Sequence, residues 1–148
     1  MCFDVDLERI RKIAEDYYRN GDFIVPKTVV KQLSMNFKSM FPEDVIKMAS
    51  GFPVGMGGMG CTCGGSDRRS HGNWPCLWQK QGKDPKVNKA MELSAKLYQI
   101  FCERHKVSCC KVLTRGMEKG SPEHMEQCIA FTGEMAYEAA KIIAENAE

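Results

Sequence analysis

A glycine-rich stretch interrupts the chain at residues 52–65, where the sequence reads FPVGMGGMGCTCGG. Each glycine inside a helix costs about 1 kcal/mol relative to alanine, because glycine loses the most backbone freedom on folding. A regular helix therefore cannot run through this stretch. We predict a tight irregular loop that delivers Cys61 and Cys63 to a defined place. Gly60 and Gly64 flank these cysteines and would let backbone amides approach a bound cofactor.

Outside this loop, apolar residues recur at three- and four-residue steps, which is typical of amphipathic helices. No useful length of the chain alternates with period two. We therefore predict an all-α fold, a compact bundle of about five to seven helices in one domain over residues 1–148. The expected helices start after Asp6 and end at Asn20-Gly21, cover about 27–40, 43–49 and 109–115 (the last capped by Ser108), and begin at Asp84-Pro85 and Ser121-Pro122.

The two longest expected helices each carry one apolar stripe that we assign to the core. On the helix after Pro85 the stripe consists of Val87, Ala90, Met91, Ser94, Leu97, Tyr98, Phe101 and Cys102. On the final helix it consists of Met125, Cys128, Ile129, Thr132, Met135, Ala136, Ala139 and Ile143.

Composition excludes several classes of function. The net charge of +2 is small and dispersed, which argues against nucleic acid as a partner. No run of 18 apolar residues exists, so we expect no membrane-spanning helix. The first residues, MCFDVDLERIRK, have acids where a signal peptide carries basic residues, which predicts a cytoplasmic protein. Eight cysteines in such a chain indicate metal binding or redox chemistry rather than structural disulfides.

The positions of the cysteines favour one soft metal centre. Cys63 lies in the glycine loop, and Cys128 lies on the stripe of the last helix. Cys109 and Cys110 fall in the first turn of a helix, where free amides and the helix dipole stabilise a thiolate. Thiolates from these places can converge on a 2Fe–2S or 4Fe–4S cluster, or on zinc.

Other cysteines and the histidines have simpler interpretations. A lone cysteine on an apolar helix face is more often a small core residue than a ligand, and we interpret Cys102 in this way. Cys128 taken alone has the same interpretation. Cys2 is incidental. We expect the histidines to be surface or capping residues, and they are His71, His105 and His124.

Three segments resemble the C-GCAxxG-C-C family of redox proteins, whose domain is related to that of split-Soret cytochromes c. They are MASGFPVGMGGMGCTCG, HKVSCCKVL and EHMEQCIAFTGEMA, which begin at residues 48, 105 and 123. Their order and spacing are similar to the family pattern over most of the chain. The resemblance implies redox activity and an iron–sulfur centre, with family cysteines at Cys63, Cys110 and Cys128 and a less favoured alternative at Cys109.

The chain departs from the family pattern at two places. The family has a second-helix cysteine in a phrase such as FYCSEAV, whereas this chain reads FIVPKTV, with Val25 or a neighbour at that position. After Cys63 the family continues as an apolar helix, whereas residues 65–81 here are polar and irregular. One hypothesis is that compensating frameshifts, in the gene or in its reported sequence, disrupted both places, because moving the reading frame of suitably chosen synonymous codons by one base gives family-like phrases there. The alternative is a divergent member in which Cys76 or Cys61 replaces the missing ligand.

Taken together, these patterns predict a small iron–sulfur electron-transfer protein from the cytoplasm of an anaerobe, with an unknown redox partner protein. The Met- and Ala-rich stripe of the final helix, with the resemblance, predicts a homodimer. One rival is a structural zinc site built from Cys61, Cys63, Cys76 and either His71 or Cys110. The other rival is a thiol–disulfide protein that uses Cys109 or Cys110, which ranks last because the chain has no CxxC motif.

Overall fold

The computed structural model describes residues 5–22, 25–37, 50, 53–60, 62–63 and 83–146. These residues form helices, turns and loops without a strand, which confirms the all-α prediction. The helices are α1 (Leu7–Arg19), α2 (Val25–Asn36), α6 (Lys86–His105), the single turn α7 (Cys110–Leu113) and α8 (Pro122–Asn146). The four helices longer than one turn in this part of the chain are fewer than the five to seven expected. The helix expected over 43–49 lies outside the described residues.

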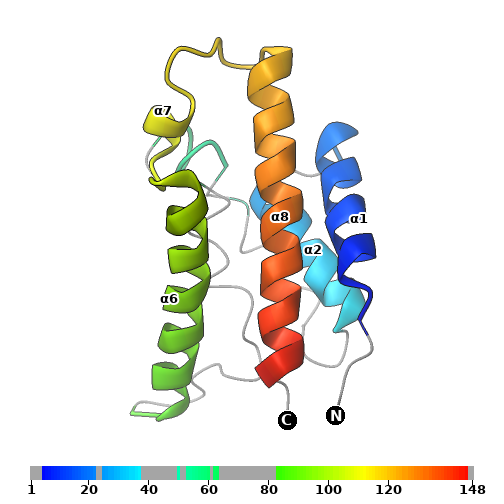
Figure 1. Ribbon diagram of the computed structural model, residues 1–148, viewed down its shortest axis with the longest axis vertical. Helices are drawn as coiled ribbons and strands as arrows, with labels where there is room; N and C mark the ends of the chain where they lie inside the picture. Colours follow the sequence, from blue (N-terminus) through cyan, green and yellow to red (C-terminus); the bar gives the residue numbers. More distant parts are fainter. Residues whose placement is uncertain are drawn as a thin grey trace.

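Helix α8 runs through the middle of the bundle, with α6 on one side, α1 on the other and α2 behind (Figure 1). Both α1 and α6 run antiparallel to α8, so the start of α1 and the end of α8 lie at the same end of the bundle. Ion pairs mark the two ends of this arrangement: Arg19 Nη2 lies 3.7 Å from Glu126 Oε2, and Lys96 Nζ lies 3.6 Å from Glu145 Oε2. The beginning of α8 therefore lies beside the end of α1.

The core forms around small residues of α8. Ala136, Ala139 and Ala140 are fully buried, and such small side chains let neighbouring helices approach closely. Larger side chains fill the space around them, namely Ile10, Val29, Leu33, Leu93, Leu97 and Phe101 from the other helices and Phe37 directly after α2. The stripe predicted for the last helix is thus largely confirmed.

Only part of the apolar stripe predicted for α6 is buried. Leu97 and Phe101 are buried, together with Leu93, which the sequence did not single out. Met91 and Tyr98 are 65% and 42% exposed, so their assignment to the core was wrong. The reason is that the buried residues of α6 follow a single line at four-residue steps, and residues beside that line face away from the core.

Two predicted helix starts are confirmed at atomic detail. The Asp6 carboxylate accepts a hydrogen bond from the Arg9 amide at 2.9 Å, as an N-cap does. The Ser121 hydroxyl accepts from the His124 amide at 3.3 Å at the start of α8. Because such side chains satisfy otherwise unpaired amides, they fix where each helix begins.

Other boundaries differ from the prediction. Helix α2 covers 25–36 instead of 27–40, and α6 begins one residue later than expected, with the Asp84 carboxylate accepting from the Lys86 amide at 3.0 Å. Helix α7 is only one turn, and Ser108 does not cap it. The Ser108 hydroxyl is instead hydrogen-bonded to the Tyr98 hydroxyl at 2.8 Å, which removes it from the helix start.

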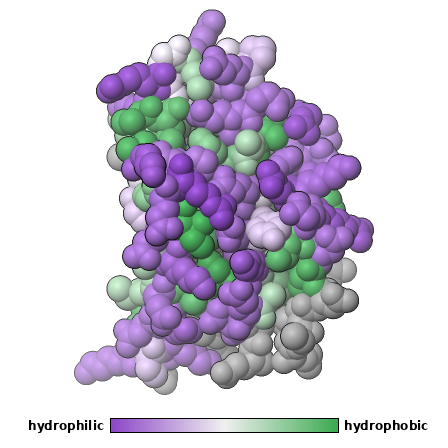
Figure 2. Space-filling view, in the orientation of Figure 1, coloured by the Kyte–Doolittle hydropathy of each residue, from purple (hydrophilic) through white to green (hydrophobic). Residues whose placement is uncertain are grey.

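The surface is mainly polar on the face seen in Figure 2, where hydrophilic side chains surround smaller hydrophobic patches. Among the described residues, the exposed large apolar side chains include Met59, Met91 and Val112. None of the described helices is long and apolar enough to cross a membrane.

Candidate functional site

The glycine-rich loop is attached to the chain around α7. The Cys63 amide donates to the Ser108 carbonyl at 2.6 Å, and the Lys111 amide donates to the Gly60 carbonyl at 3.1 Å. The Cys109 thiol also donates to the Gly60 carbonyl, at 3.8 Å. Residues far apart in sequence are therefore held side by side, as Figure 1 shows for the loop and α7.

The backbone of this loop explains its glycine content. Five successive residues, Val54 to Gly58, have φ between +56° and +86°, the left-handed region that glycine adopts at little cost. The Gly58 amide donates to the Pro53 carbonyl and the Gly60 amide to the Val54 carbonyl. The irregular loop is confirmed over its described residues, and the amides of Gly58 and Gly60 donate within the loop. Cys61 and Gly64 lie outside the described residues.

Three of the predicted cysteines lie in the same region of the structure. Cys63 is 8% exposed, and the thiols of Cys110 and Cys128 are half-buried. Burial, followed by the nearby Cys63 and Cys110 thiols, raises the pKa of Cys128 to about 11. Burial, followed by the Cys63 and Cys109 thiols, also raises the pKa of Cys110, and Lys119 opposes that rise. Thiols from a loop, α7 and α8 thus lie within electrostatic reach of each other.

Tyr18, from the last turn of α1, belongs to this thiol cluster of Cys63, Cys110 and Cys128. Its hydroxyl is close enough to the Cys128 thiol for each group to shift the pKa of the other. Burial, and then the Cys128 thiolate, raise the pKa of the Tyr18 hydroxyl, so it remains a donor. The sequence analysis did not identify Tyr18 as a site residue, because periodicity marks it only as part of an apolar helix face.

His124 also approaches the thiol cluster. The Gly120 amide donates to His124 Nδ1 at 3.3 Å, which places the proton of the neutral imidazole on Nε2. That Nε2 lies 3.9 Å from the Cys128 sulfur. The expectation of a surface or capping histidine therefore missed a contact with a candidate ligand. The four-residue spacing of His124 and Cys128 on one helix face was the available signal.

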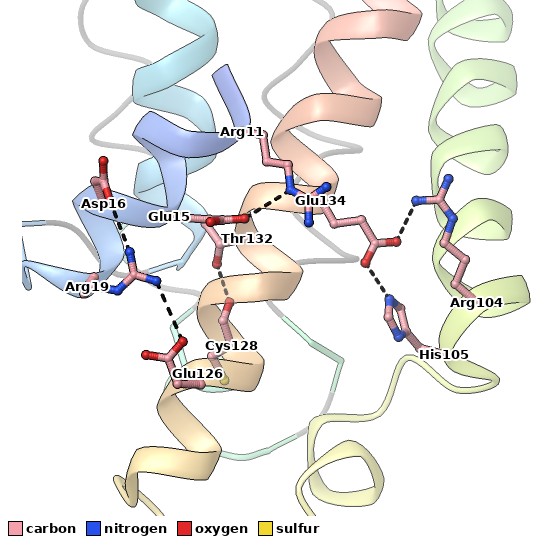
Figure 3. Close-up of polar contacts among 10 residues, drawn as sticks. All are labelled: Arg11, Glu15, Asp16, Arg19, Arg104, His105, Glu126, Cys128, Thr132 and Glu134. Atoms are coloured by element: carbon pink, nitrogen blue, oxygen red, sulfur yellow. Dashed lines mark hydrogen bonds and ion pairs between the residues drawn. The ribbon is translucent and has the colours of Figure 1, made fainter. Parts of the chain in front are cut away.

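A second polar cluster joins α6 to α8 away from the thiols (Figure 3). Arg104 contacts Glu134 at 2.7 Å and Glu138 at 2.6 Å, and His105 Nε2 lies 2.8 Å from the second oxygen of Glu134. The His105 ring also packs against Phe101 and Phe131, with centroids 4.7 and 4.4 Å away. His105 is therefore a bridging residue between helices and not the surface residue that was expected.

In this second cluster, which we call the Glu134 clamp, paired charges hold α6 and α8 together; its residues are Arg104, His105, Glu134 and Glu138. Burial raises the pKa of Glu134, but hydrogen bonds from Arg104 and His105 outweigh it and hold that pKa below its ordinary value. Hydrogen bonds to Glu134 and Glu138 raise the pKa of Arg104. Each charge has a partner, which is how partly buried ions are tolerated between helices.

The thiol cluster fits an iron–sulfur centre in the chemistry of its donors. Thiolate sulfur is the preferred ligand of iron–sulfur clusters, which commonly take four cysteines. The described residues contribute three, and Cys61 and Cys76 lie outside them. No three Cys, His, Asp or Glu side chains in the described part of the chain are close enough to hold a single metal ion. Most of the predicted zinc ligands, Cys61, Cys76 and His71, also lie outside it.

Comparison with known proteins agrees with the resemblance noted in the sequence. A family model described as "Putative redox-active protein (C_GCAxxG_C_C)" matches residues 26–142. This match covers most of the chain, so the chain belongs to the C_GCAxxG_C_C family. It includes all three clustered cysteines but not Tyr18. No curated protein and no solved structure matches the chain significantly.

Proposed function

We propose that this chain is an electron-transfer protein that binds an iron–sulfur cluster through Cys63, Cys110 and Cys128. The observation that supports the proposal is the proximity of these thiols, because burial and then the buried Cys63 thiol raise the pKa of both Cys110 and Cys128. Burial and neighbouring thiols raise the pKa of Cys110 and of Cys128, so these two thiols keep their protons while the site is unliganded. A bound cation would reverse this preference, because metal binding replaces the protons of its ligands.

The chain itself contributes more than ligands to such a site. The Tyr18 hydroxyl and the Nε2 of His124 both lie against the Cys128 sulfur. Hydrogen bonds to a ligand sulfur stabilise its negative charge and so tune the reduction potential. Burial of Cys63 limits the access of water. When bound, the cluster would supply one-electron chemistry, and Cys61 or Cys109 would be the candidates for a further donor.

Protein purified without oxygen tests this proposal. We expect a brown sample with broad visible absorption and with iron and sulfide in proportion to the chain. Iron analysis of Cys128→Ser should show a loss of most iron, because a hydroxyl is a poor ligand for a soft centre. Cys102→Ser is the matched control, since Cys102 lies on α6 and is half-buried like Cys128. A colourless protein with stoichiometric zinc would favour the zinc alternative instead.

A further inference from the structure

A pocket of about 180 Å³ opens between the glycine loop, α7 and the beginning of α8. Cys110, Lys111, Lys119 and His124 are among the residues that line it. The space corresponds to about six water molecules at ~30 Å³ each, which suits a ligand of similar heavy-atom count. The pocket therefore gives a small molecule access to Cys110 from outside the bundle.

The walls of this pocket are held in place by the contacts that attach the loop to α7. The Lys111 amide is bonded to the Gly60 carbonyl, and the Lys111 side chain covers the place where a Cβ on Gly60 would lie. The Thr114 hydroxyl donates to the Cys110 carbonyl at 2.8 Å. His124 is oriented by the Gly120 amide. The pocket thus has a defined shape before any ligand enters.

The charge of the lining has one sign. Lys111 and Lys119 both line the pocket, and no Asp or Glu is among the described lining residues. Neither lysine has an ion-pair partner in the part of the chain that the structure describes. Two lysines that line one small cavity, with no ion-pair partner among the described residues, attract anions. Val54 and Met117 add apolar surface to the same lining.

We propose that this pocket binds a small organic anion of carboxylate type, with its charge between Lys111 and Lys119 and its apolar part near Val54 and Met117. The anion then lies beside the Cys110 sulfur. This proposal concerns substrate or effector access and does not require a cluster. The proposed anion site would serve any reaction in which the Cys110 thiol takes part.

Two alkylating reagents of similar size test the proposal on the full chain. Iodoacetate carries a carboxylate, and iodoacetamide is neutral. In both reactions the Cys110 thiolate attacks the CH₂ carbon, the new S–C bond forms and iodide leaves. The ratio of the two rates cancels the thiolate fraction of Cys110, because the same thiolate attacks both reagents. Mass spectrometry of the peptides gives this ratio separately for Cys110 and for Cys102.

We expect the iodoacetate-to-iodoacetamide ratio to be about fivefold higher at Cys110 than at Cys102, as for one exposed ion pair. The Cys110 rate should also saturate with iodoacetate concentration. Lys119→Gln and Lys111→Gln should each lower the ratio at Cys110 at least about twofold. Lys141→Gln, an exposed change on α8, should leave it unchanged. Equal ratios at the two cysteines, or a lysine effect that Lys141→Gln reproduces, would overturn the proposal.

If Cys110 reacts with neither reagent, anion binding to the pocket is measured directly by NMR. Acetate is titrated into ¹⁵N-labelled protein, and the signals of the Gly120 amide and the His124 ring are followed. Saturable shifts in the wild type that are lost in Lys119→Gln support the anion pocket. Shifts that stay linear with acetate, or persist in Lys119→Gln, contradict it.

Discussion

The Tyr18 hydroxyl lies beside the thiol of Cys128 and holds the pKa of that thiol below the value that burial alone would give, where the last turn of α1 meets α8. The Arg19–Glu126 ion pair at 3.7 Å lies beside it and fixes the same two helix ends together (Figure 3). Tyr18 precedes the part of the chain that the family model matches. The first helix is therefore part of the site and not only part of the scaffold.

The thiol of Cys128 should be slow to react in the metal-free chain. Its pKa of about 11 leaves a small thiolate fraction at pH 8, and the higher intrinsic nucleophilicity of such a thiolate offsets only part of this. We expect alkylation by iodoacetamide about tenfold slower than for an ordinary thiol, with a pH–rate profile that reaches its midpoint near pH 11. If the pH–rate profile had its midpoint at or below pH 9.0, burial and the neighbouring thiols would not be holding the Cys128 thiol protonated.

Tyr18→Phe tests the interaction of the Tyr18 hydroxyl with Cys128. The ring stays in place while the donor is lost, so the Cys128 thiolate loses stabilisation and its pKa rises. Alkylation of Cys128 at pH 9 should slow by about threefold, in line with one net hydrogen bond. Tyr17→Phe is the matched control, because the Tyr17 hydroxyl donates to the Met35 sulfur at 3.6 Å. Equal rates in Tyr18→Phe and the wild type would remove Tyr18 from the site.

The Glu134 clamp makes stability depend on pH. The folded-state pKa of Glu134 lies below its ordinary value of 4.5, so its contribution is complete above that pH and is lost as pH falls through the folded pKa. Glu134→Gln should lower the free energy of unfolding at pH 7 by about 1 kcal/mol. Urea unfolding should show this difference shrinking towards pH 3.

The control for this change is Glu92→Gln, which removes an exposed carboxylate 3.0 Å from Lys89. It should alter stability by less than about 0.5 kcal/mol at either pH. A Glu134→Gln effect that is the same at pH 7 and pH 3 would mean that the loss comes from packing and not from the carboxylate charge.

Gly60→Ala tests the close approach of the loop to α7. Gly60 has φ +68°, and a Cβ there would lie 2.7 Å from Lys111 Cγ. We expect a loss of about 2 kcal/mol in thermal or urea unfolding, about half from the backbone and half from displacing Lys111. Gly58→Ala separates these two parts, since its φ is +86° with no atom within 4 Å of the Cβ position. Equal losses in both variants would contradict the packing contribution.

The sequence predicted the helical class and several ends because those features depend on local chemistry. Asp6 and Ser121 cap helices through neighbouring amides, and the apolar stripe of α8 reflects a helix that is covered on several sides. The same reasoning failed for Met91 and Tyr98, because periodicity does not reveal how many neighbours a helix has. The burial of the α8 stripe within the chain also means that the predicted homodimer would need a different surface.

The candidate site was predictable only in part. The types and order of Cys63, Cys110 and Cys128 identified the cluster, since soft donors near a glycine loop are rare in ordinary cores. Tyr18 enters the cluster through the packing of α1 on α8, which has no local signature, whereas His124 could have been found from its four-residue spacing to Cys128 on α8. The two departures from the family pattern fall on residues 65–81, which lie outside the described part, and near Val25, whose side chain is not described.

Iron bound per chain in Cys63→Ser, measured on protein purified without oxygen, tests the central claim most directly. Cys63 is the most buried of the three clustered thiols, and its neighbours respond to its charge. We predict that the variant loses most of the iron and the visible absorption, while Cys102→Ser keeps both. Equal iron content in the wild type and in Cys63→Ser would contradict the site as placed here.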